Sequence, residues 1–286
     1  MAKSVIIGSN GQLGSDVMKA FANEEAVGLT HDDIEITDID SVRRALSDLK
    51  PDIVVNTAAY HNVPKCEIEI EQAFRVNALG ALNLAKVTES LGIDLVHIST
   101  DYVFDGNKRA PYVETDLPNP LSVYAASKLA GEHLVAAYSS RHYIVRSSGL
   151  YGHATCRAKG TNFVETMLKL SKQKDELRVV NDEILTPTST VHLAEQLREV
   201  VKTKAYGLYH ATNNGSCSWY EFAKAIFEIA GVSIKVAPVS SAEYAAPVKR
   251  PLYSVLQNRA LQSLGIDNMP EWREGLHHYF QVKINN

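Results

Sequence analysis

The chain has 286 residues, of which 45% are hydrophobic and 22% charged, and its formal net charge at pH 7 is −4. This composition is ordinary for a soluble globular protein and gives no bulk attraction for nucleic acid. No apolar run approaches the ~18 residues that a membrane span needs, the N-terminus enters a strand without a signal peptide, and the three cysteines are scattered. We therefore expect a cytoplasmic protein with no nucleic-acid partner, no membrane partner and no metal site.

The chain opens with an apolar strand, a glycine-rich turn and a helix, in the run KSVIIGSNGQLGSDVMKAF. Gly8 allows a sharp turn out of the strand, Gly11 lets the backbone approach a pyrophosphate, and Gly14 lets the helix pack closely on the sheet. Phosphates would then lie at the helix N-terminus, where free N–H groups and the helix dipole favour negative charge. This pattern predicts a dinucleotide site.

The second strand, expected at AVGLT, bears on the choice of cofactor. In dinucleotide-binding folds an acid usually ends this strand and binds the ribose hydroxyls of adenosine. Here the strand ends in Thr30 and His31, and Asp32 and Asp33 come slightly later. Without an acid at its end, the strand would not repel a 2′-phosphate, and His31 could contact one. NADPH is the predicted cofactor, with NADH tolerated; His31 merely facing solvent is the alternative.

Strands alternate with helices through the first half of the chain, and the strands are short, nearly continuous apolar runs such as DIVVNTA, DLVHIST and HYIVRSS. Such runs are typical of parallel strands buried on both faces. The pattern predicts an α/β fold with a Rossmann-type doubly wound parallel sheet. We expect the dinucleotide domain at residues 1–150 plus about 181–212. A small substrate lobe is expected at about 151–180 and 213–286.

Tyr124 and Lys128 lie four residues apart in the run VYAASKLAGEHL, so a helix would place both on one face. A lysine ammonium beside a phenol would lower the phenol pKa from ~10 and prepare it for proton transfer. Thr100, at the end of the preceding strand, could hold a substrate oxygen. This set predicts reduction of a carbonyl. A second pair, Tyr220 and Lys224, lies on an ordinary amphipathic helix with no such strand before it.

With the glycine turn, the runs NTAAY and STDYVF and the Tyr124–Lys128 pair in order, the chain resembles the extended short-chain dehydrogenase/reductases. It is most similar to their dTDP-4-dehydrorhamnose reductase family, nearly end to end. The resemblance implies NADPH-dependent reduction of the C4 ketone of dTDP-4-dehydro-L-rhamnose to dTDP-L-rhamnose, for cell-surface polysaccharide.

The resemblance also implies roles for individual residues. Thr100 would orient the ketone, Tyr124 would donate the proton, and Lys128 would bind the nicotinamide ribose and tune Tyr124. Further cofactor contacts are implied at Gln12, Leu13, Ala58, Ala59 and Tyr60. Contacts to the nucleotide sugar are implied at Val63, Asp101, Gly149 and Arg250.

The chain departs from that family on the substrate side. Gly149 stands where the family usually has a tryptophan, and the loop over residues 152–161 is longer than usual. We expect a wider site, with His153, Arg157 and Lys159 offering positive charge to the diphosphate. Two alternatives remain: another nucleotide-linked 4-keto-6-deoxyhexose as substrate, or a non-catalytic regulatory NADP-binding subunit. The sequence leaves open a homodimer and a Mg²⁺ requirement.

Overall fold

The computed structural model describes residues 2–155 and 160–284 and contains a six-stranded parallel sheet. Its strands are β1 (Lys3–Ile7), β2 (Glu25–Leu29), β3 (Ile53–Asn56), β4 (Asp94–Thr100), β5 (His142–Ser147) and β10 (Gly207–His210). They lie in the order β10-β5-β4-β3-β1-β2. Because β1 lies between β2 and β3, the winding direction reverses there, and ligands of such sheets bind outside the carboxyl ends of the strands at this point. The predicted α/β fold is confirmed.

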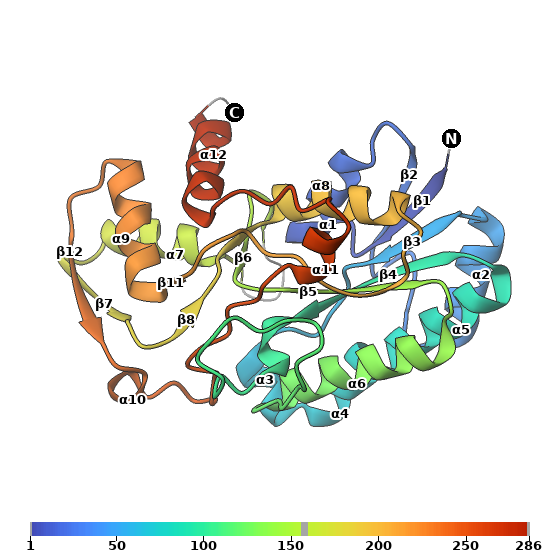
Figure 1. Ribbon diagram of the computed structural model, residues 1–286, viewed down its shortest axis with the longest axis horizontal. Helices are drawn as coiled ribbons and strands as arrows, with labels where there is room; N and C mark the ends of the chain where they lie inside the picture. The colour runs from blue at the N-terminus through green and yellow to red at the C-terminus, as the bar shows by residue number, and fades with distance from the viewer. Residues whose placement is uncertain (1, 156–159, 285–286) are drawn as a thin grey trace.

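Helices cover both faces of this sheet (Figure 1). One face is covered by α1 (Gln12–Ala20) and α8 (Thr190–Lys202), and the other by α2 (Ile39–Leu49), α5 (Ala81–Leu91) and α6 (Val123–Tyr138). Alternation along each strand explains the two cores, because Ile6 packs towards α1 and α8 whereas Val5 and Ile7 pack towards α2 and α5. Burial on both faces is why the strands form continuous apolar runs in the sequence.

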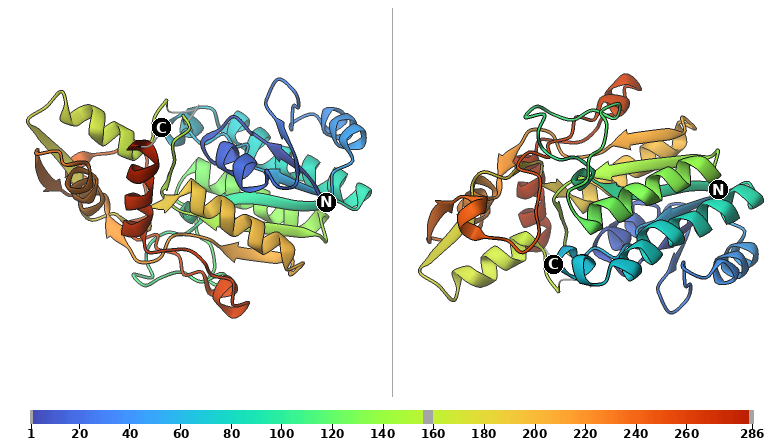
Figure 2. Two further views of the ribbon diagram at one scale, coloured as in Figure 1. Left: turned by 90° about the horizontal axis from the view of Figure 1, so that it is seen from above. Right: turned by 90° about the horizontal axis from the view of Figure 1, so that it is seen from below.

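A second group of elements lies beside the sheet and has a hydrophobic cluster of its own. It contains α7 (Phe163–Ser171), β7 (Glu176–Val180), α9 (Trp219–Ala230), β12 (Lys235–Val239), α10 (Ser241–Tyr244) and α12 (Trp272–Ile284). Figure 2 shows the two groups side by side from above and from below, with α12 between them. The helix α11 (Arg259–Ser263) packs on the sheet, because its Leu261 joins the cluster of β10 and α8.

Short elements connect the two groups near the carboxyl ends of the sheet strands. Two small strand pairs are β6 (Leu150–Tyr151) with β9 (Thr188–Ser189) and β8 (Ile184–Leu185) with β11 (Cys217–Ser218). The remaining elements are α3 (Val63–Ile68), α4 (Ile70–Phe74), the π-helix η1 (Arg75–Gly80) and the 3₁₀ turn η2 (Asp101–Val103). Across the described ranges, none of the helices combines the length and the apolarity that crossing a membrane would require.

Candidate active site

The turn between β1 and α1 has the backbone geometry of a phosphate-binding turn. Gly8 has φ +78°, and a Cβ added there would lie 2.9 Å from Thr57 Oγ1. Gly11 precedes α1 without any side-chain cap, which leaves the first N–H groups of α1, at Gln12 and Leu13, available to a phosphate. A Cβ on Gly14 would lie 2.1 Å from the Gly8 carbonyl oxygen, so the close packing predicted for this glycine is confirmed.

The segment after β3 forms a wall beside this turn. Thr57 Oγ1 donates to the Ile7 carbonyl at 2.8 Å, which ties the segment to β1. The backbone of Tyr60 is held on both sides by Asn77, whose Oδ1 accepts from Tyr60 N at 2.8 Å and whose Nδ2 donates to Tyr60 O at 2.9 Å. Asn77 belongs to η1, and π-helical turns are frequent at functional sites. The predicted cofactor residues Ala58, Ala59 and Tyr60 therefore lie in an ordered segment.

The end of β2 differs from the sequence prediction, because an acid does lie there. The Asp33 carboxylate folds back and accepts hydrogen bonds from Thr30 N and Thr30 Oγ1, both at 2.8 Å. The bond from the Thr30 backbone N–H lowers the Asp33 pKa, so this carboxylate is ionised at neutral pH. His31 is exposed, and its Nε2 lies 3.6 Å from Glu35 Oε2. The expected acid-free end of β2 is wrong, because a turn of three residues returns Asp33 to it.

The structure brings Thr100, Tyr124 and Lys128 together at the carboxyl end of β4. Thr100 is the last residue of β4, and Ser122 caps α6 by accepting from Ala125 N at 3.3 Å. This cap starts the helix just before Tyr124, and Lys128 follows one turn later with its side chain buried. The hydroxyls of Thr100 and Tyr124 are hydrogen-bonded. The juxtaposition predicted from the spacing is present.

The electrostatics of this trio differ from the sequence prediction. Burial raises the pKa of Tyr124 above its usual value, and the bond with Thr100 only partly opposes this. The Lys128 Nζ donates instead to the Ile98 carbonyl at 2.6 Å and lies 3.3 Å from His97 Nε2. Burial lowers the pKa of Lys128 to about 8, against the influence of Glu132. The expected lowering of the Tyr124 pKa by Lys128 is therefore wrong, and Tyr124 is protonated at neutral pH, as a proton donor must be.

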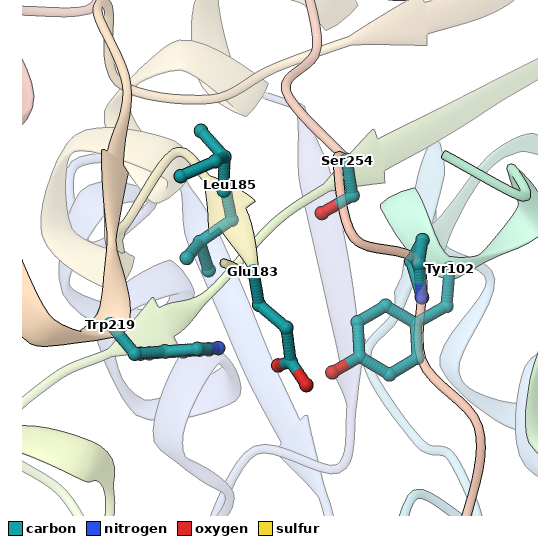
Figure 3. Close-up of a pocket in the computed structure, with 7 residues that line it drawn as sticks. Tyr102, Glu183, Leu185, Trp219 and Ser254 are labelled. Carbon is teal, nitrogen blue, oxygen red and sulfur yellow. The ribbon is translucent and has the colours of Figure 1, made fainter. Parts of the chain in front are cut away.

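A small pocket opens beside Tyr102, and both groups of elements contribute to it (Figure 3). Trp219 from the start of α9 and Tyr102 from η2 lie on opposite sides, with the Glu183 carboxylate between them. The Tyr102 ring meets the Tyr124 ring edge-on, with centroids 6.1 Å apart. Arg250 Nη1 lies 3.9 Å from Glu183 Oε2. The pocket is lined by Tyr102, Glu183, Ile184, Leu185, Trp219, Pro251 and Ser254. A flat indole suits the apolar face of a sugar ring, a carboxylate can accept from sugar hydroxyls, and a guanidinium suits a phosphate.

Asp101 lies behind the wall of this pocket. Its Oδ2 accepts from Ser254 Oγ at 2.6 Å and Ser148 Oγ at 2.8 Å, and its Oδ1 accepts from Thr100 Oγ1 at 3.2 Å. Burial raises the pKa of Asp101 to about 6, although these three hydroxyl donors oppose the shift. Asp101 therefore positions Thr100 and the Ser254 wall, and its direct contact with a sugar stays a prediction. Val63, likewise predicted to face the sugar, is buried as the first residue of α3.

Gly149 does not provide the predicted extra room, and His153 does not provide the predicted charge. A Cβ on Gly149, where φ is +55°, would lie 2.8 Å from Leu185 Cδ1 and 3.2 Å from Pro187 Cα, so the adjacent space is filled. The His153 ring stacks on Tyr279, with centroids 4.2 Å apart, and burial lowers its pKa. His153 is thus a neutral packing residue, and the wider site expected at Gly149 is wrong. The other cations predicted here, Arg157 and Lys159, lie outside the described residues.

The helix α9 packs in the second hydrophobic cluster over most of its length, as predicted, but its first residue lines the pocket. Phe222 and Ile226 are buried in the second hydrophobic cluster, whereas Lys224 is exposed and lies over the Tyr220 ring at 5.5 Å. This pair therefore differs from the first, whose lysine is buried. Trp219 shares the apolar spacing of this helix, yet it lines the pocket. Trp219 is the first residue of α9, directly after the Ser218 cap. This position is the signal that could have distinguished it from the buried residues of the same helix.

The described residues give no support to a metal centre. Among them, no group of three or more His, Cys, Asp and Glu side chains could hold a metal ion. The Mg²⁺ requirement left open by the sequence has no candidate ligand set in this part of the chain.

Comparisons with known proteins agree with this geometry. A family model described as the RmlD substrate binding domain matches residues 2–284. The spore coat polysaccharide biosynthesis protein SpsK of Bacillus subtilis is 43% identical over 99% of this chain and 98% of its own. A dTDP-4-dehydrorhamnose reductase of Sinorhizobium fredii is 38% identical over 94% and 93%. The dTDP-4-dehydrorhamnose reductase of Bacillus anthracis in complex with NADP has a TM-score of 0.94 at 40% identity, over 98% and 99%. A dTDP-4-keto-6-deoxy-D-glucose reductase of Streptomyces niveus is 36% identical over 97% and 96%.

Proposed function

Because the chain belongs to the family described as the RmlD substrate binding domain, we propose that it reduces the C4 ketone of dTDP-4-dehydro-L-rhamnose with NADPH. The product is dTDP-L-rhamnose, a precursor for polysaccharide synthesis. The observation that carries the proposal is the hydrogen-bonded pair of Thr100 and Tyr124 above the buried Lys128, at the sheet edge that also holds the glycine turn. We place the reaction in the cytoplasm, where nucleotide sugars are made.

Each residue of the site has a distinct task in this reaction. When bound, NADPH would supply the hydride that reduces the carbonyl carbon. The Thr100 hydroxyl holds the carbonyl oxygen beside Tyr124, and the protonated Tyr124 phenol gives its proton to that oxygen as it becomes a hydroxyl. The first N–H groups of α1, with Gly8, Gly11 and Gly14, hold the diphosphate of the cofactor. Lys128 binds the nicotinamide ribose.

The second group of elements serves as the substrate lobe in this proposal. Its hydrophobic cluster draws on residues 151–179 and 217–280, close to the boundaries predicted from sequence. Trp219 offers its indole to the apolar face of the sugar, and Arg250 offers a guanidinium to the diphosphate. The dinucleotide domain would then comprise the sheet, its five flanking helices and α11, which packs on the sheet.

The proposal is tested by following NADPH oxidation with dTDP-4-dehydro-L-rhamnose generated in situ, and by identifying the sugar product. Oxidation that yields dTDP-L-rhamnose supports the proposal. Binding of NADPH without turnover on any 4-keto-6-deoxy sugar would instead identify a non-catalytic NADP-binding subunit. Because Gly149 and Leu185 change the wall beside the sugar, dTDP-4-keto-6-deoxy-D-glucose should be assayed in parallel as the second candidate substrate.

Substitution of Trp219 should affect sugar binding more than the chemical step. Trp219→Ala removes a flat surface from the pocket, and aromatic contacts of this kind contribute about 1 kcal/mol beyond the area they bury, so KM for the nucleotide sugar should rise about fivefold to tenfold with kcat little changed. Steady-state kinetics at saturating NADPH measure this. Trp219→Phe keeps a ring and should recover most of the affinity. An unaltered KM in Trp219→Ala would place the sugar elsewhere.

The choice between NADPH and NADH should respond to the charge at the end of β2. The ionised Asp33 carboxylate is bound to Thr30, where an adenosine ribose would lie, and it should disfavour a 2′-phosphate. Asp33→Asn should therefore raise the preference for NADPH over NADH several-fold, whereas Thr30→Asp should shift the preference towards NADH. The ratio of kcat/KM for the two cofactors measures both shifts. If the unaltered protein, Asp33→Asn and Thr30→Asp all give the same ratio, the end of β2 does not determine the choice of cofactor.

A further inference from the structure

His97 is a buried histidine that the proposed reaction does not use. It lies in the middle of β4 and is 1% exposed. Its two ring nitrogens face two polar side chains: Nε2 lies 3.3 Å from Lys128 Nζ, and Nδ1 lies 3.2 Å from Asn56 Nδ2. A histidine in contact with the catalytic lysine can influence the chemistry of that lysine, and the direction depends on which nitrogen carries the proton.

Asn56 determines the tautomer of His97. The backbone N–H of Ala58 donates to Asn56 Oδ1 at 3.1 Å, so the NH₂ group of the amide is the end that faces His97. An amide NH₂ can only donate, so His97 Nδ1 must accept. Burial, together with the charge of Lys128, lowers the pKa of His97 well below its usual value, so the ring is neutral. A neutral ring that accepts at Nδ1 carries its single proton on Nε2, the nitrogen beside Lys128.

An N–H group aimed at Lys128 Nζ distinguishes between the two charge states of the lysine. An uncharged amine has a lone pair that can accept from His97 Nε2–H, whereas an ammonium has three donors and no acceptor. The second bond of Lys128, to the Ile98 carbonyl at 2.6 Å, suits either form. We propose that His97, held by Asn56 in the Nε2–H tautomer, is a positioning residue that stabilises the uncharged form of Lys128.

The charged and titratable groups around Lys128 support a balance between its two forms. Glu132, one turn further along α6, favours the ammonium, but it is already paired with Arg146 of β5 at 2.6 Å and accepts from Ser99 of β4. Burial acts in the opposite direction, and it is the larger influence on the pKa of Lys128. Asp101 and Cys66 act on Tyr124. From η1, the uncharged Asn77 donates to Ser127 Oγ at 2.9 Å.

This balance couples the binding of NADPH to the uptake of a proton by Lys128. This step rests on the proposed function, because it takes NADPH as the ligand of Lys128. Above the pKa of Lys128, the site must gain a proton to offer an ammonium to the ribose, and affinity should then fall about tenfold per pH unit. The inflection is expected near the lowered Lys128 pKa of about 8.

The first test measures the dissociation constant of NADPH between about pH 6 and about pH 10, without any sugar. Lys128→Met should abolish the inflection and so assign it. His97→Gln is neutral and similar in size, and its amide can turn its oxygen towards an ammonium, so the inflection should move up by about one unit or more. His210→Gln, at a buried histidine of β10 whose Nδ1 lies 3.1 Å from the Tyr112 carbonyl oxygen, is the matched control and should leave the inflection in place. An inflection that does not move in His97→Gln overturns the proposal.

The second test uses the unaltered protein and does not depend on the folding of any variant. Nitrogen-15 NMR of the histidine rings above the inflection should show His97 protonated at Nε2, and protonation at Nδ1 would overturn the proposal. Neither test needs the nucleotide sugar. Absence of turnover on the sugar would therefore count against the proposed substrate alone. Failure of the unaltered protein to bind NADPH would count against the proposed cofactor. The NMR measurement of the His97 tautomer would then still test the proposed role of His97.

Discussion

Tyr124→Phe should reduce turnover by about 10²- to 10⁴-fold, the range that general acid catalysis contributes, while the affinity for NADPH stays near that of the unaltered protein. The substitution removes the hydroxyl that is bonded to Thr100 at the proposed carbonyl site and keeps the ring that meets Tyr102 edge-on. The raised pKa of Tyr124 means that the lost group is a protonated phenol across the neutral range. Single-turnover kinetics with saturating NADPH separate this chemical step from binding.

Tyr220→Phe is the matched control for that substitution. It removes the same atom from a tyrosine that also precedes a lysine by four residues, but on α9, where the lysine is exposed. Turnover should remain near that of the unaltered protein. Equal losses in both variants would show that the first effect arises from something other than proton donation.

Gly14→Ala should lower the free energy of unfolding by about 1–3 kcal/mol, the usual cost of forcing extra atoms into a packed site, and should weaken NADPH binding at the same time. The added Cβ would lie 2.1 Å from the carbonyl oxygen of Gly8 and 2.8 Å from its carbonyl carbon. These are backbone atoms of the phosphate turn, so relief requires α1 to move away from the turn.

Gly11→Ala gives the graded comparison for this effect. Its Cβ would have a single close neighbour, the Gly8 carbonyl oxygen at 3.1 Å, and its φ of −83° is open to alanine. Denaturant unfolding should therefore show a smaller loss of stability than for Gly14→Ala. A larger loss of stability for Gly11→Ala would mean that close packing of Gly14 on Gly8 does not determine the stability of this turn.

The sequence predicted those parts of the site that depend on one short segment. The glycine spacing fixes the turn before α1, and the four-residue spacing of Tyr124 and Lys128 fixes their place on α6, because both follow from the geometry of a single element. The parallel sheet could be predicted for a similar reason, since burial on both faces makes each strand a continuous apolar run.

Contacts between distant segments, and the folding of one turn, were missed. Asp33 returns to Thr30 through a side-chain bond that strand periodicity does not encode. Trp219 shares the apolar spacing of α9, yet its side chain lines the pocket with Tyr102 and Leu185 whereas its helix neighbours are buried in the second cluster. The contact between His97 and Lys128 joins a strand to a helix, and it changes the expected electrostatics of the catalytic trio.

The filled space beside Gly149 has a consequence for how this pocket could have diverged. A tryptophan gained at position 149 would place its Cβ 2.8 Å from the Leu185 Cδ1, so the Leu185 side chain would have to shift. Removing Leu185 first would open a buried cavity, and large-to-small changes of this kind cost about 2–5 kcal/mol. Each single replacement therefore lowers stability as long as the other position is unchanged. The two positions form an epistatic pair, and a lineage that exchanges one wall for the other must cross a fitness valley or change both codons nearly together.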